Sequence, residues 1–473
     1  MKIEQIYTGC LAQGAYFIES EGEAAVIDPL RETEPYMERA ARSGAQIKYI
    51  FETHFHADFV SGHLDLAKKT GAQIVYGPKA ETDYEKYTAR DGEEFKIGKI
   101  TIRVLHTPGH TPESTCYLLL DESGKPHSIF TGDTLFIGDV GRPDLAQKST
   151  GLTQEDLAGW SFDSLRNKIM PLPDEVIVYP AHGAGSACGK NMSSETWSTL
   201  GQQKATNYAL RADMTRDEFI AELTDGLLPP PAYFKENARI NKSGYESIDK
   251  VMKRGAKALS PQEFEAAANA TDALMLDVRS KEDFVKGFIP NSIFIGLDGS
   301  FAPWVGALIP DLMQPILLIT PKGQEAEAVK RLARVGYDNA LGYLEGGFEA
   351  WQQAGKEVDQ IDTIKAATFD VRYAANPNIS ILDVRKPGEF EGEHIENALH
   401  FSLDDISSNM HLVDKNNEYY LHCRSGYRST IAASILKSRG FDKLVNVQDK
   451  FESIIAGAVP TTDFVCPSTK TTN

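Results

Sequence analysis

Short apolar runs, separated by polar and glycine-containing segments, recur through the first half of the chain and predict β-strands. Apolar residues at helical spacing lie between several of these runs and predict helices. The expected strands cover residues 3–7, 16–18, 24–27, 47–51, 73–77, 94–105, 116–120 and 128–130, and the expected helices cover 31–45, 62–70 and 154–170. This alternation favours a sandwich of two sheets with helices on the outside.

A glycine- and serine-rich loop at residues 183–194 follows these elements. Two helical segments are expected around 195–210 and 215–223, and a run of three prolines at 229–231 ends the second. The polar stretch from there to about residue 258 has the composition of a linker. It therefore predicts a domain boundary.

The second half of the chain contains an internal repeat. The run Leu276-Asp277-Val278-Arg279 recurs as Leu382-Asp383-Val384-Arg385, about 105 residues later. An apolar strand follows in each copy, at 316–319 and at 419–421. This spacing is long enough for each copy to form a complete small α/β domain.

The composition, 41% hydrophobic and 25% charged over 473 residues, is typical of a soluble globular protein. No apolar run approaches the roughly 18–20 residues of a membrane span, and the first residues lack the apolar core of a signal peptide. The net charge of −18 disfavours nucleic acids and anionic membranes as partners. Five scattered cysteines, an odd number, fit a reducing compartment. We therefore expect a cytoplasmic protein.

His54, His56 and Asp58 come directly after the expected strand at 47–51. Side chains at a strand end are held rigidly and still reach an open edge, which suits a metal site. Neutral imidazole and carboxylate are common ligands of zinc and iron. Two nearby histidines also occur on surface loops without a metal, so this stretch alone leaves both interpretations open.

Three further candidate ligands, His110, Asp133 and His182, follow other expected strands in the same way, each beside glycine or proline. The complete series resembles the metallo-β-lactamase superfamily, and the resemblance covers roughly residues 1–250. It implies an α/β fold in which an αββα sandwich carries the metal at the ends of its strands.

Phe59 stands where dinuclear hydrolases of this superfamily carry a histidine for a second metal. A phenyl ring cannot ligate, so we expect a mononuclear centre. The subgroup that the chain then resembles is the persulfide dioxygenases. By this resemblance one Fe(II) per chain is held by His54, His110 and Asp133, and His56 lies near the metal without binding it.

The same resemblance suggests roles for residues around the metal. Asp58 remains from the broken second site, and His182 would orient substrate or oxygen. Arg142 would pair with a carboxylate or phosphate of a thiol substrate, or alternatively form a structural salt bridge with Asp144. Cys188 is a possible thiol site near the cleft, with a structural role as the alternative.

Cys423 follows a strand of the second repeat, at a turn that leads into a helix. Backbone N–H groups at such a turn, together with Arg424 and Arg428, would stabilise a thiolate. The repeat resembles the rhodanese (sulfurtransferase) domain in tandem, which implies a Cys423 persulfide. A cysteine followed closely by arginine also occurs in phosphatases, but the Leu-Asp-Val-Arg strand favours sulfur transfer. Thr320 takes the place of the cysteine in the first copy, which we expect to be catalytically silent.

The chain as a whole resembles a persulfide dioxygenase–rhodanese fusion. We expect a metallo-β-lactamase-fold dioxygenase domain at 1–250, a silent rhodanese-like domain at 259–356, an active rhodanese domain at 363–460 and a tail at 461–473. The resemblance implies oxidation of low-molecular-weight persulfides by O2 to sulfite, and transfer of sulfane sulfur from Cys423 to sulfite. The product would be thiosulfate, as in sulfide detoxification. We also expect a homo-oligomer.

Two other functions compete with this hypothesis. A thioester hydrolase of the glyoxalase II type needs a metal-activated water, usually from two metals, and Phe59 counts against it. A sulfur-carrier or sensor protein would use its metal domain only as a scaffold. Structural metal sites are normally closed by four ligands, whereas three are expected here.

Overall fold

The computed structural model describes all residues except 147–150, 228, 458 and 466–473. Its chain forms two compact units, one of residues 1–251 and 330–338 and the other of residues 252–329 and 339–473. Cys466 and most of the expected tail lie outside the described residues. Each unit is described separately below.

The first unit contains two six-stranded sheets that face each other. The first sheet is ordered β1 (Lys2–Thr8), β2 (Gln13–Ser20), β3 (Glu23–Ile27), β4 (Gln46–Glu52), β5 (Gln73–Tyr76) and β6 (Tyr87–Thr88). The second is ordered β12 (Ser198–Thr199), β11 (Ile177–Pro180), β10 (Pro126–Gly132), β9 (Thr115–Leu120), β8 (Ile100–His106) and β7 (Glu94–Ile97). From β3 to β6 neighbouring strands of the first sheet run parallel, so their carboxyl ends meet at one edge.

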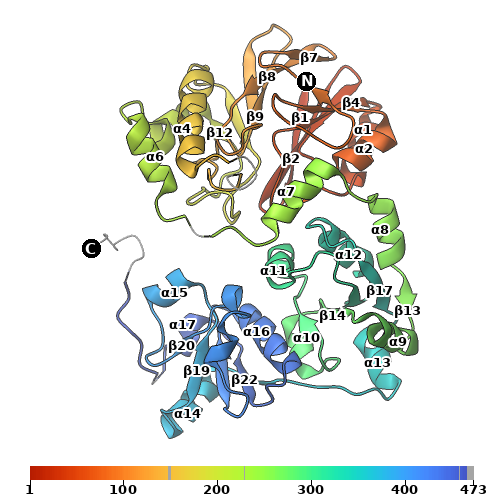
Figure 1. The fold of residues 1–473 in the computed structure, drawn as a ribbon, viewed down its shortest axis with the longest axis vertical. Coiled ribbons are helices and arrows are strands. Elements are labelled where there is room, and N and C mark those ends of the chain that lie inside the picture. The colour runs from red at the N-terminus through yellow and green to blue at the C-terminus, as the bar shows by residue number, and fades with distance from the viewer. Residues whose placement is uncertain (147–150, 228, 458, 466–473) are drawn as a thin grey trace. The chain divides into compact units, whose positions relative to one another are not determined.

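Alternation along β2 shows how the layers form. Tyr16 and Ile18 belong to the core between the two sheets, whereas Ala15 and Phe17 face the opposite side. Helices α1 (Glu34–Ser43) and α2 (His63–Thr70) pack on that outer side, and α4 (Gln154–Ser164) and α6 (Arg216–Thr224) pack on the outer side of the second sheet. Figure 1 shows the resulting four layers. The predicted αββα sandwich is confirmed.

Some boundaries differ from the sequence prediction. The expected strand at 94–105 is a hairpin, because Gly98 turns the chain with φ +54° and approaches the Ser20 carbonyl too closely for a side chain. The expected helix at 154–170 ends in a π-helical turn at Leu165–Ile169. Later in the first unit come α5 (Leu200–Thr206) and a short 3₁₀ turn at Tyr208–Leu210.

The polar stretch before residue 258 is not a linker, and that prediction was wrong. It contains α7 (Phe234–Ser243) and α8 (Ile248–Gly255). Helix α7 buries Phe234, Asn237 and Asn241 although its average composition is polar. The Asn241 amide is buried because it bonds to backbone groups of His56, Phe59 and Ser61, and composition alone does not reveal such contacts.

The second unit contains two five-stranded parallel sheets of identical topology. The first repeat is ordered β13 (Ala258–Leu259), β17 (Ala340–Leu344), β16 (Ile316–Ile319), β14 (Leu274–Asp277) and β15 (Ile293–Phe294). The second is ordered β18 (Asp362–Ile364), β22 (Leu444–Val447), β21 (Tyr419–His422), β19 (Ser380–Asp383) and β20 (Leu399–His400). The predicted pair of small α/β domains is thereby confirmed.

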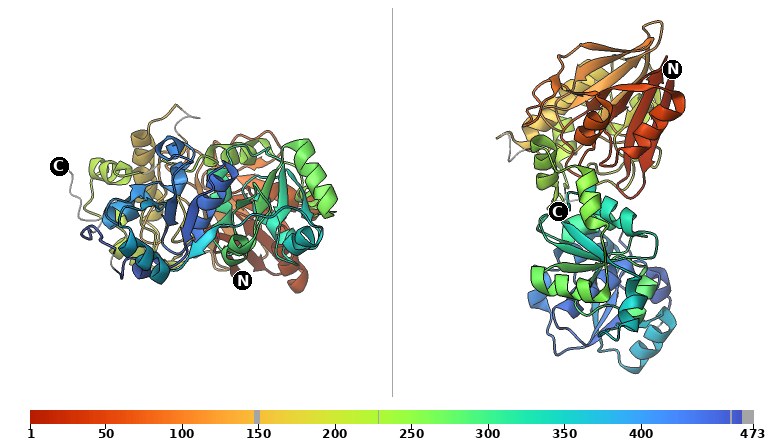
Figure 2. Two further views of the ribbon diagram at one scale, coloured as in Figure 1. Left: turned by 90° about the horizontal axis from the view of Figure 1, so that it is seen from below. Right: turned by 90° about the vertical axis from the view of Figure 1, so that its right-hand side faces the viewer.

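Helices flank both sheets, as the views in Figure 2 show, with the first repeat in green to teal and the second in blue. The first repeat carries α9 (Pro261–Thr271), α10 (Lys281–Lys286), α11 (Phe301–Leu308), α12 (Glu325–Ala333) and α13 (Gly347–Gln353). The second carries α14 (Ala366–Ala375), α15 (Pro387–Gly392), α16 (Tyr427–Ser438) and α17 (Phe451–Ile454). In the described part of the chain, no helix combines the length and apolar character needed to cross a membrane.

The two repeats touch at helix α16. The backbone N–H of Phe294, on β15, donates to the buried Ser434 hydroxyl at 3.0 Å. The Tyr427 hydroxyl donates to the Gly296 carbonyl at 2.7 Å. Tyr427 is the first residue of α16, so the first repeat contacts the start of the helix that follows the Cys423 loop.

Candidate active sites

Strand ends gather the predicted ligands of the first unit in one place. His54 follows β4, Asp133 follows β10, His110 lies in the loop after β8, and His182 comes two residues after β11. The turn before Asp133 requires glycine, because Gly132 has φ +51° and a Cβ there would lie 2.6 Å from the Thr53 hydroxyl. The turn lets β10 approach the His54 loop closely.

Three of these side chains form a compact buried group. Ligand atoms of His54, His110 and Asp133 all lie within 4.8 Å of one another. Asp133 Oδ2 is 3.8 Å from His54 Nε2 and 3.4 Å from His110 Nε2. Two ligands bound to one ion at about 2.1 Å lie roughly 3–4 Å apart, so these spacings fit a shared metal.

The surroundings of Asp133 also fit a cation. Its two carboxylate oxygens are buried and have no hydrogen-bond partner among the described residues. A buried carboxylate without hydrogen bonds is costly unless a cation compensates it. The donor set, two imidazoles and one carboxylate, is one that catalytic zinc and non-haem iron both use.

The two imidazoles are oriented for binding. His110 Nδ1 lies 2.8 Å from the Arg142 carbonyl, which can only accept a hydrogen bond. Nδ1 therefore carries the proton and Nε2 presents its lone pair towards Asp133. Burial, with smaller contributions from neighbouring histidines, holds the pKa of His54 well below its ordinary value, so its ring is neutral and able to ligate.

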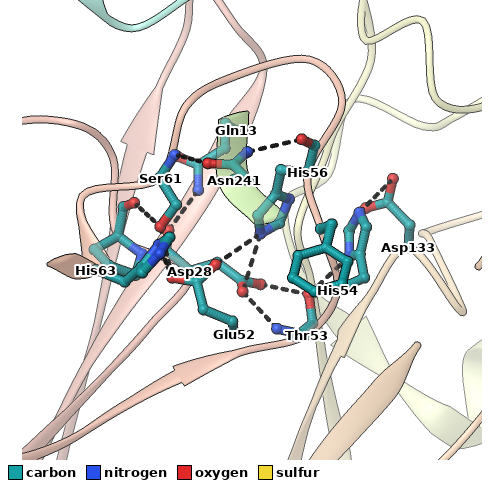
Figure 3. A network of polar contacts seen from close by, with 12 residues as sticks. Gln13, Asp28, Glu52, Thr53, His54, His56, Ser61, His63, Asp133 and Asn241 are labelled. Carbon is teal, nitrogen blue, oxygen red and sulfur yellow. Dashed lines mark hydrogen bonds and ion pairs between the residues drawn. The ribbon is translucent and has the colours of Figure 1, made fainter. Parts of the chain in front are cut away.

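His56 directs its Nε2 towards Asp28 and Glu52, as Figure 3 shows, and a ring nitrogen of His56 also lies within 4.8 Å of ligand atoms of Asp58 and His182. Its Nε2 is 3.1 Å from Asp28 and 3.7 Å from Glu52, and its ring stacks on Phe59. Burial alone would lower the pKa of His56, but Asp28 and Glu52 raise it to about 9. A protonated imidazole has no lone pair for a metal.

A second group shares Asp133 with the first. His182 Nε2 lies 3.5 Å from Asp58 Oδ2 and 3.6 Å from Asp133 Oδ1. Cys188 joins Asp133 and His182 within 4.8 Å. Burial, followed by the charges of Asp58 and Asp133, raises the pKa of the Cys188 thiol well above its ordinary value. The place that a second metal would take in dinuclear members of the superfamily therefore keeps polar side chains, while Phe59 is fully buried beside His56.

Arg142 is buried and engaged by its neighbours. Its guanidinium forms two hydrogen bonds with the Asp144 carboxylate, at 2.6 and 2.7 Å, and a third with the Ala187 carbonyl at 3.3 Å. Its backbone N–H donates to the Cys188 carbonyl at 3.0 Å. This residue ties the loop after Asp133 to the Cys188 loop, and pairing with a substrate anion would require it to share the Asp144 contact.

Several residues that organise the site were not identified from the sequence. Asn241, on α7, donates to the His56 carbonyl at 2.8 Å and the Phe59 carbonyl at 2.7 Å, and accepts from the Ser61 N–H at 2.9 Å. The Asp28 carboxylate accepts hydrogen bonds from the Thr53 N–H and hydroxyl, both at 2.8 Å. The sequence predicted the strand that ends before Asp28 but not its neighbour: the structure pairs β3 in parallel with β4, and parallel strands end at the same sheet edge.

The loop around Cys423 forms the second candidate site. Cys423 follows β21 and is buried, and its sulfur accepts a hydrogen bond from the Gly426 N–H at 3.1 Å. Gly426 has φ +85°, and a Cβ there would meet Gln448 at 2.6 Å, so the turn requires glycine. A backbone N–H directed at sulfur stabilises a thiolate or a persulfide anion.

The two arginines of this loop differ in their environment. Arg424 is exposed. Arg428 forms a bidentate ion pair with Glu389 of α15, at 2.5 and 2.9 Å. Burial would lower the pKa of Arg428, but Glu389 and Cys423 raise it, so the guanidinium stays charged beside the sulfur. The corresponding loop of the first repeat begins with Thr320 and has neither arginine.

Comparisons with known proteins agree with this architecture. A family model described as "Metallo-beta-lactamase superfamily" matches residues 8–182. A model described as "Rhodanese-like domain" matches residues 260–354 and 367–456. Both matches confirm the fold class expected from the sequence.

Similar proteins carry two different activities in their names. "Probable hydroxyacylglutathione hydrolase glo2" of Schizosaccharomyces pombe is 31% identical over 199 residues, which cover 41% of this chain and 72% of that protein. "Persulfide dioxygenase ETHE1, mitochondrial" of Homo sapiens is 30% identical over 215 residues, 44% of this chain and 74% of that protein. A crystal structure of a metallo-beta-lactamase from Staphylococcus aureus has a TM-score of 0.64 and 33% identity, and covers 73% of this chain and 98% of that one.

Proposed function

We propose a persulfide dioxygenase function for the N-terminal domain of this chain, which belongs to the metallo-β-lactamase superfamily and continues into two rhodanese-like domains. The observation that carries the proposal is the group His54, His110 and Asp133, together with a His56 whose Nε2 contacts Asp28 and a buried Phe59. It supports one metal with two imidazoles and one carboxylate, as in mononuclear iron oxygenases.

These residues would hold one Fe(II), which supplies open coordination positions and electron density for the reaction of a persulfide with O2. The chain's own groups would keep the ligands oriented. The Arg142 carbonyl holds the His110 ring, and Asn241 fixes the backbone that carries His56 and Phe59. The overall reaction is R–S–SH + O2 + H2O → R–SH + SO3²⁻ + 2 H⁺, with R–S–SH a low-molecular-weight persulfide.

His182, Asp58 and Cys188 would form the side of the site that faces Asp133 Oδ1. We propose that His182 orients the persulfide or oxygen there, since its Nε2 lies close to both carboxylates. The Cys188 thiol is protonated in this environment and would serve as a hydrogen-bond donor to the substrate rather than as a nucleophile.

For the second repeat we propose sulfur transfer through Cys423. The thiolate takes the outer sulfur of a persulfide, Cys423–S⁻ + R–S–SH → Cys423–S–S⁻ + R–SH, and passes it to sulfite, Cys423–S–S⁻ + SO3²⁻ → Cys423–S⁻ + S2O3²⁻. The Gly426 N–H and the Arg428 charge support both anionic forms. Thiosulfate formation would then consume the sulfite made in the first domain.

A thioester hydrolase of the glyoxalase II type is the second candidate. It is favoured by the comparable similarity to a hydroxyacylglutathione hydrolase and by the group of Asp58, Asp133, His182 and Cys188. Two metals could activate a water there. Phe59 provides no ligand where such hydrolases carry a histidine, which is why the dioxygenase is preferred.

Oxygen uptake by the Fe(II)-loaded protein with glutathione persulfide tests the proposal. We expect persulfide-dependent uptake in the wild type and its loss in His110→Ala, because that variant lacks one proposed ligand. The same preparations, loaded with Zn(II) or Fe(II), are assayed for hydrolysis of a glutathione thioester.

Uptake without thioester hydrolysis supports the dioxygenase. Hydrolysis without uptake, together with two bound metals per chain, would replace it by the hydrolase. Persulfide loading on Cys423 with neither turnover would leave a sulfur carrier with a structural metal domain.

A further inference from the structure

Asp28 occupies an unusual backbone position beside the proposed metal site. Its φ is +48°, a left-handed conformation that residues other than glycine adopt only at a cost. Its backbone N–H donates to the Phe51 carbonyl at 3.0 Å, and its carbonyl accepts from the Gln13 amide at 2.9 Å. The surrounding structure therefore holds the backbone of this buried residue from both sides.

Both carboxylate oxygens of Asp28 also contact neighbouring polar groups. Its Oδ1 accepts from the Thr53 N–H at 2.8 Å and lies 3.1 Å from His56 Nε2. Its Oδ2 accepts from the Thr53 hydroxyl at 2.8 Å. Figure 3 shows this carboxylate between His56 and the segment that carries His54.

The Thr53 hydroxyl continues the chain of contacts to His54. Its oxygen lies 3.0 Å from His54 Nδ1. A hydroxyl has one hydrogen, and a carboxylate can only accept, so the hydrogen points to Asp28. The oxygen's lone pair then faces Nδ1, and only an Nδ1–H tautomer completes the contact.

This arrangement repeats what the Arg142 carbonyl does for His110 by a different route. In both cases an acceptor at Nδ1 leaves the Nε2 lone pair directed towards Asp133. Acceptors of this kind fix the tautomer and ring orientation of a metal-ligating histidine and make it a better donor.

We propose that Asp28 and Thr53 are positioning residues that act through His54. The Thr53 hydroxyl links the Asp28 carboxylate to His54 Nδ1. The inference rests on the proposed metal site. It predicts that metal affinity depends on a hydroxyl at position 53, although Thr53 does not itself reach the metal.

Metal affinity of the full-length protein tests the relay without using turnover. Fe(II) dissociation constants are measured anaerobically by competition with a chromophoric chelator, and the absorption of the Co(II)-loaded protein reports ligand geometry. Thr53→Val keeps the shape of the side chain and removes the hydroxyl, and we expect its Fe(II) dissociation constant to rise roughly 10–100-fold with altered Co(II) bands. Thr53→Ser restores the hydroxyl and is expected to bind metal like the wild type.

Two further variants sharpen the design. Thr101→Val is the matched control, because Thr101 is buried at the far end of β8 from His106 and its hydroxyl accepts from Lys96 at 2.7 Å. It should leave metal affinity unchanged. Asp28→Asn should weaken binding in the wild-type background and have no added effect in Thr53→Val, if it acts through the hydroxyl.

The outcomes separate the two claims. If the wild type binds no metal, the proposed site fails and the relay with it. If the wild type binds metal that is lost in His110→Ala, and Thr53→Val binds normally or Thr53→Ser binds as weakly as Thr53→Val, only the relay is overturned.

Discussion

The two rhodanese-like repeats contain the same buried ion pair at the same strand end. In the second repeat, Arg385 binds both oxygens of Asp383, at 2.9 and 2.6 Å, and donates to the Glu393 carbonyl at 2.7 Å. Its guanidinium lies over the Phe451 ring, 3.7 Å from the centroid. This cluster closes the space between β19 and the start of α17.

The first repeat reproduces each contact with its own residues. Arg279 binds Asp277 at 2.9 and 2.6 Å and donates to the Gly287 carbonyl at 2.8 Å. Its guanidinium lies 4.3 Å from the centre of the Phe348 ring. The sequences of the last turns differ, yet each provides a phenylalanine at the same place.

The repeats differ where the central strand ends. The second has His422 and Cys423, and the first has Ile319 and Thr320 at these positions. The ion pair is thus kept in a repeat that lacks the thiol, which indicates that it stabilises the fold. The chemistry depends on the few residues that only the second loop has.

The largest expected effect comes from the thiol. Cys423→Ser should lower thiosulfate sulfurtransferase activity by at least about 10³-fold, because a hydroxyl cannot carry sulfane sulfur. Initial rates of transfer to an acceptor, with mass spectrometry of the loaded protein, measure it. Thr320→Cys in the Cys423→Ser protein is the counterpart and should remain inactive, since its loop lacks both arginines. Recovery of activity there would contradict the distinction between the repeats.

Breaking either ion pair should lower the free energy of unfolding by a similar amount. Arg385→Ala and Arg279→Ala each leave a buried carboxylate without its partner, which typically lowers the free energy of unfolding by about 3–5 kcal/mol. Denaturant unfolding of the two variants beside the wild type measures the loss. A large effect in only one repeat would show that the shared geometry is not a shared scaffold.

A smaller effect is expected from the arginine that only the active loop has. Arg428→Lys keeps the charge but loses the bidentate contact with Glu389, so the KM for thiosulfate should rise roughly tenfold. Steady-state kinetics give the value. Glu325→Lys alters the matching position of the silent loop and should leave the kinetics unchanged. Equal effects of both variants would rule out a specific role for Arg428.

The smallest expected difference between the repeats is in how the stability of each depends on pH. Burial alone would raise the pKa of Asp383, but His422 and Arg385 lower it, whereas burial raises the pKa of Asp277 despite Arg279. Asp383 therefore stabilises the fold above its unfolded pKa, and this contribution is lost as the pH falls through the lower folded value. Asp277 has the opposite sign, because its folded form binds the proton more readily.

Acid unfolding of Asp383→Asn and Asp277→Asn tests this difference. Asp383→Asn should flatten the decrease in stability with falling pH below about 4, the ordinary aspartate range, and Asp277→Asn should not. If both variants show the same slope, His422 does not distinguish the two carboxylates.

The fold and much of the first site could be predicted because both follow from strand ends. His54, His110, Asp133 and His182 each come after an apolar run, and the structure brings them together as expected. The assignment of three of them as the metal ligands remains a prediction. The repeats were found because the Leu-Asp-Val-Arg run includes the residues of the shared ion pair.

Contacts between distant segments could not be predicted. Asn241 holds the His56 loop from a helix 185 positions later, and the polar composition of that helix suggested a linker. The orientation of His56 towards Asp28 also depends on tertiary packing. Such contacts leave no periodic pattern in the sequence, because each depends on one side chain meeting a backbone group or an ion-pair partner from elsewhere.

The product released from a persulfide by the full-length, Fe(II)-loaded protein tests the central claim most directly. Wild type and Cys423→Ser are given glutathione persulfide in air, and initial rates of sulfite and thiosulfate formation are measured beside a protein-free control. The account predicts thiosulfate from the wild type and sulfite from Cys423→Ser, at equal rates of oxygen uptake. Enzyme-dependent thiosulfate formation at the same rate in both, or no sulfur oxyanion from either, would contradict it.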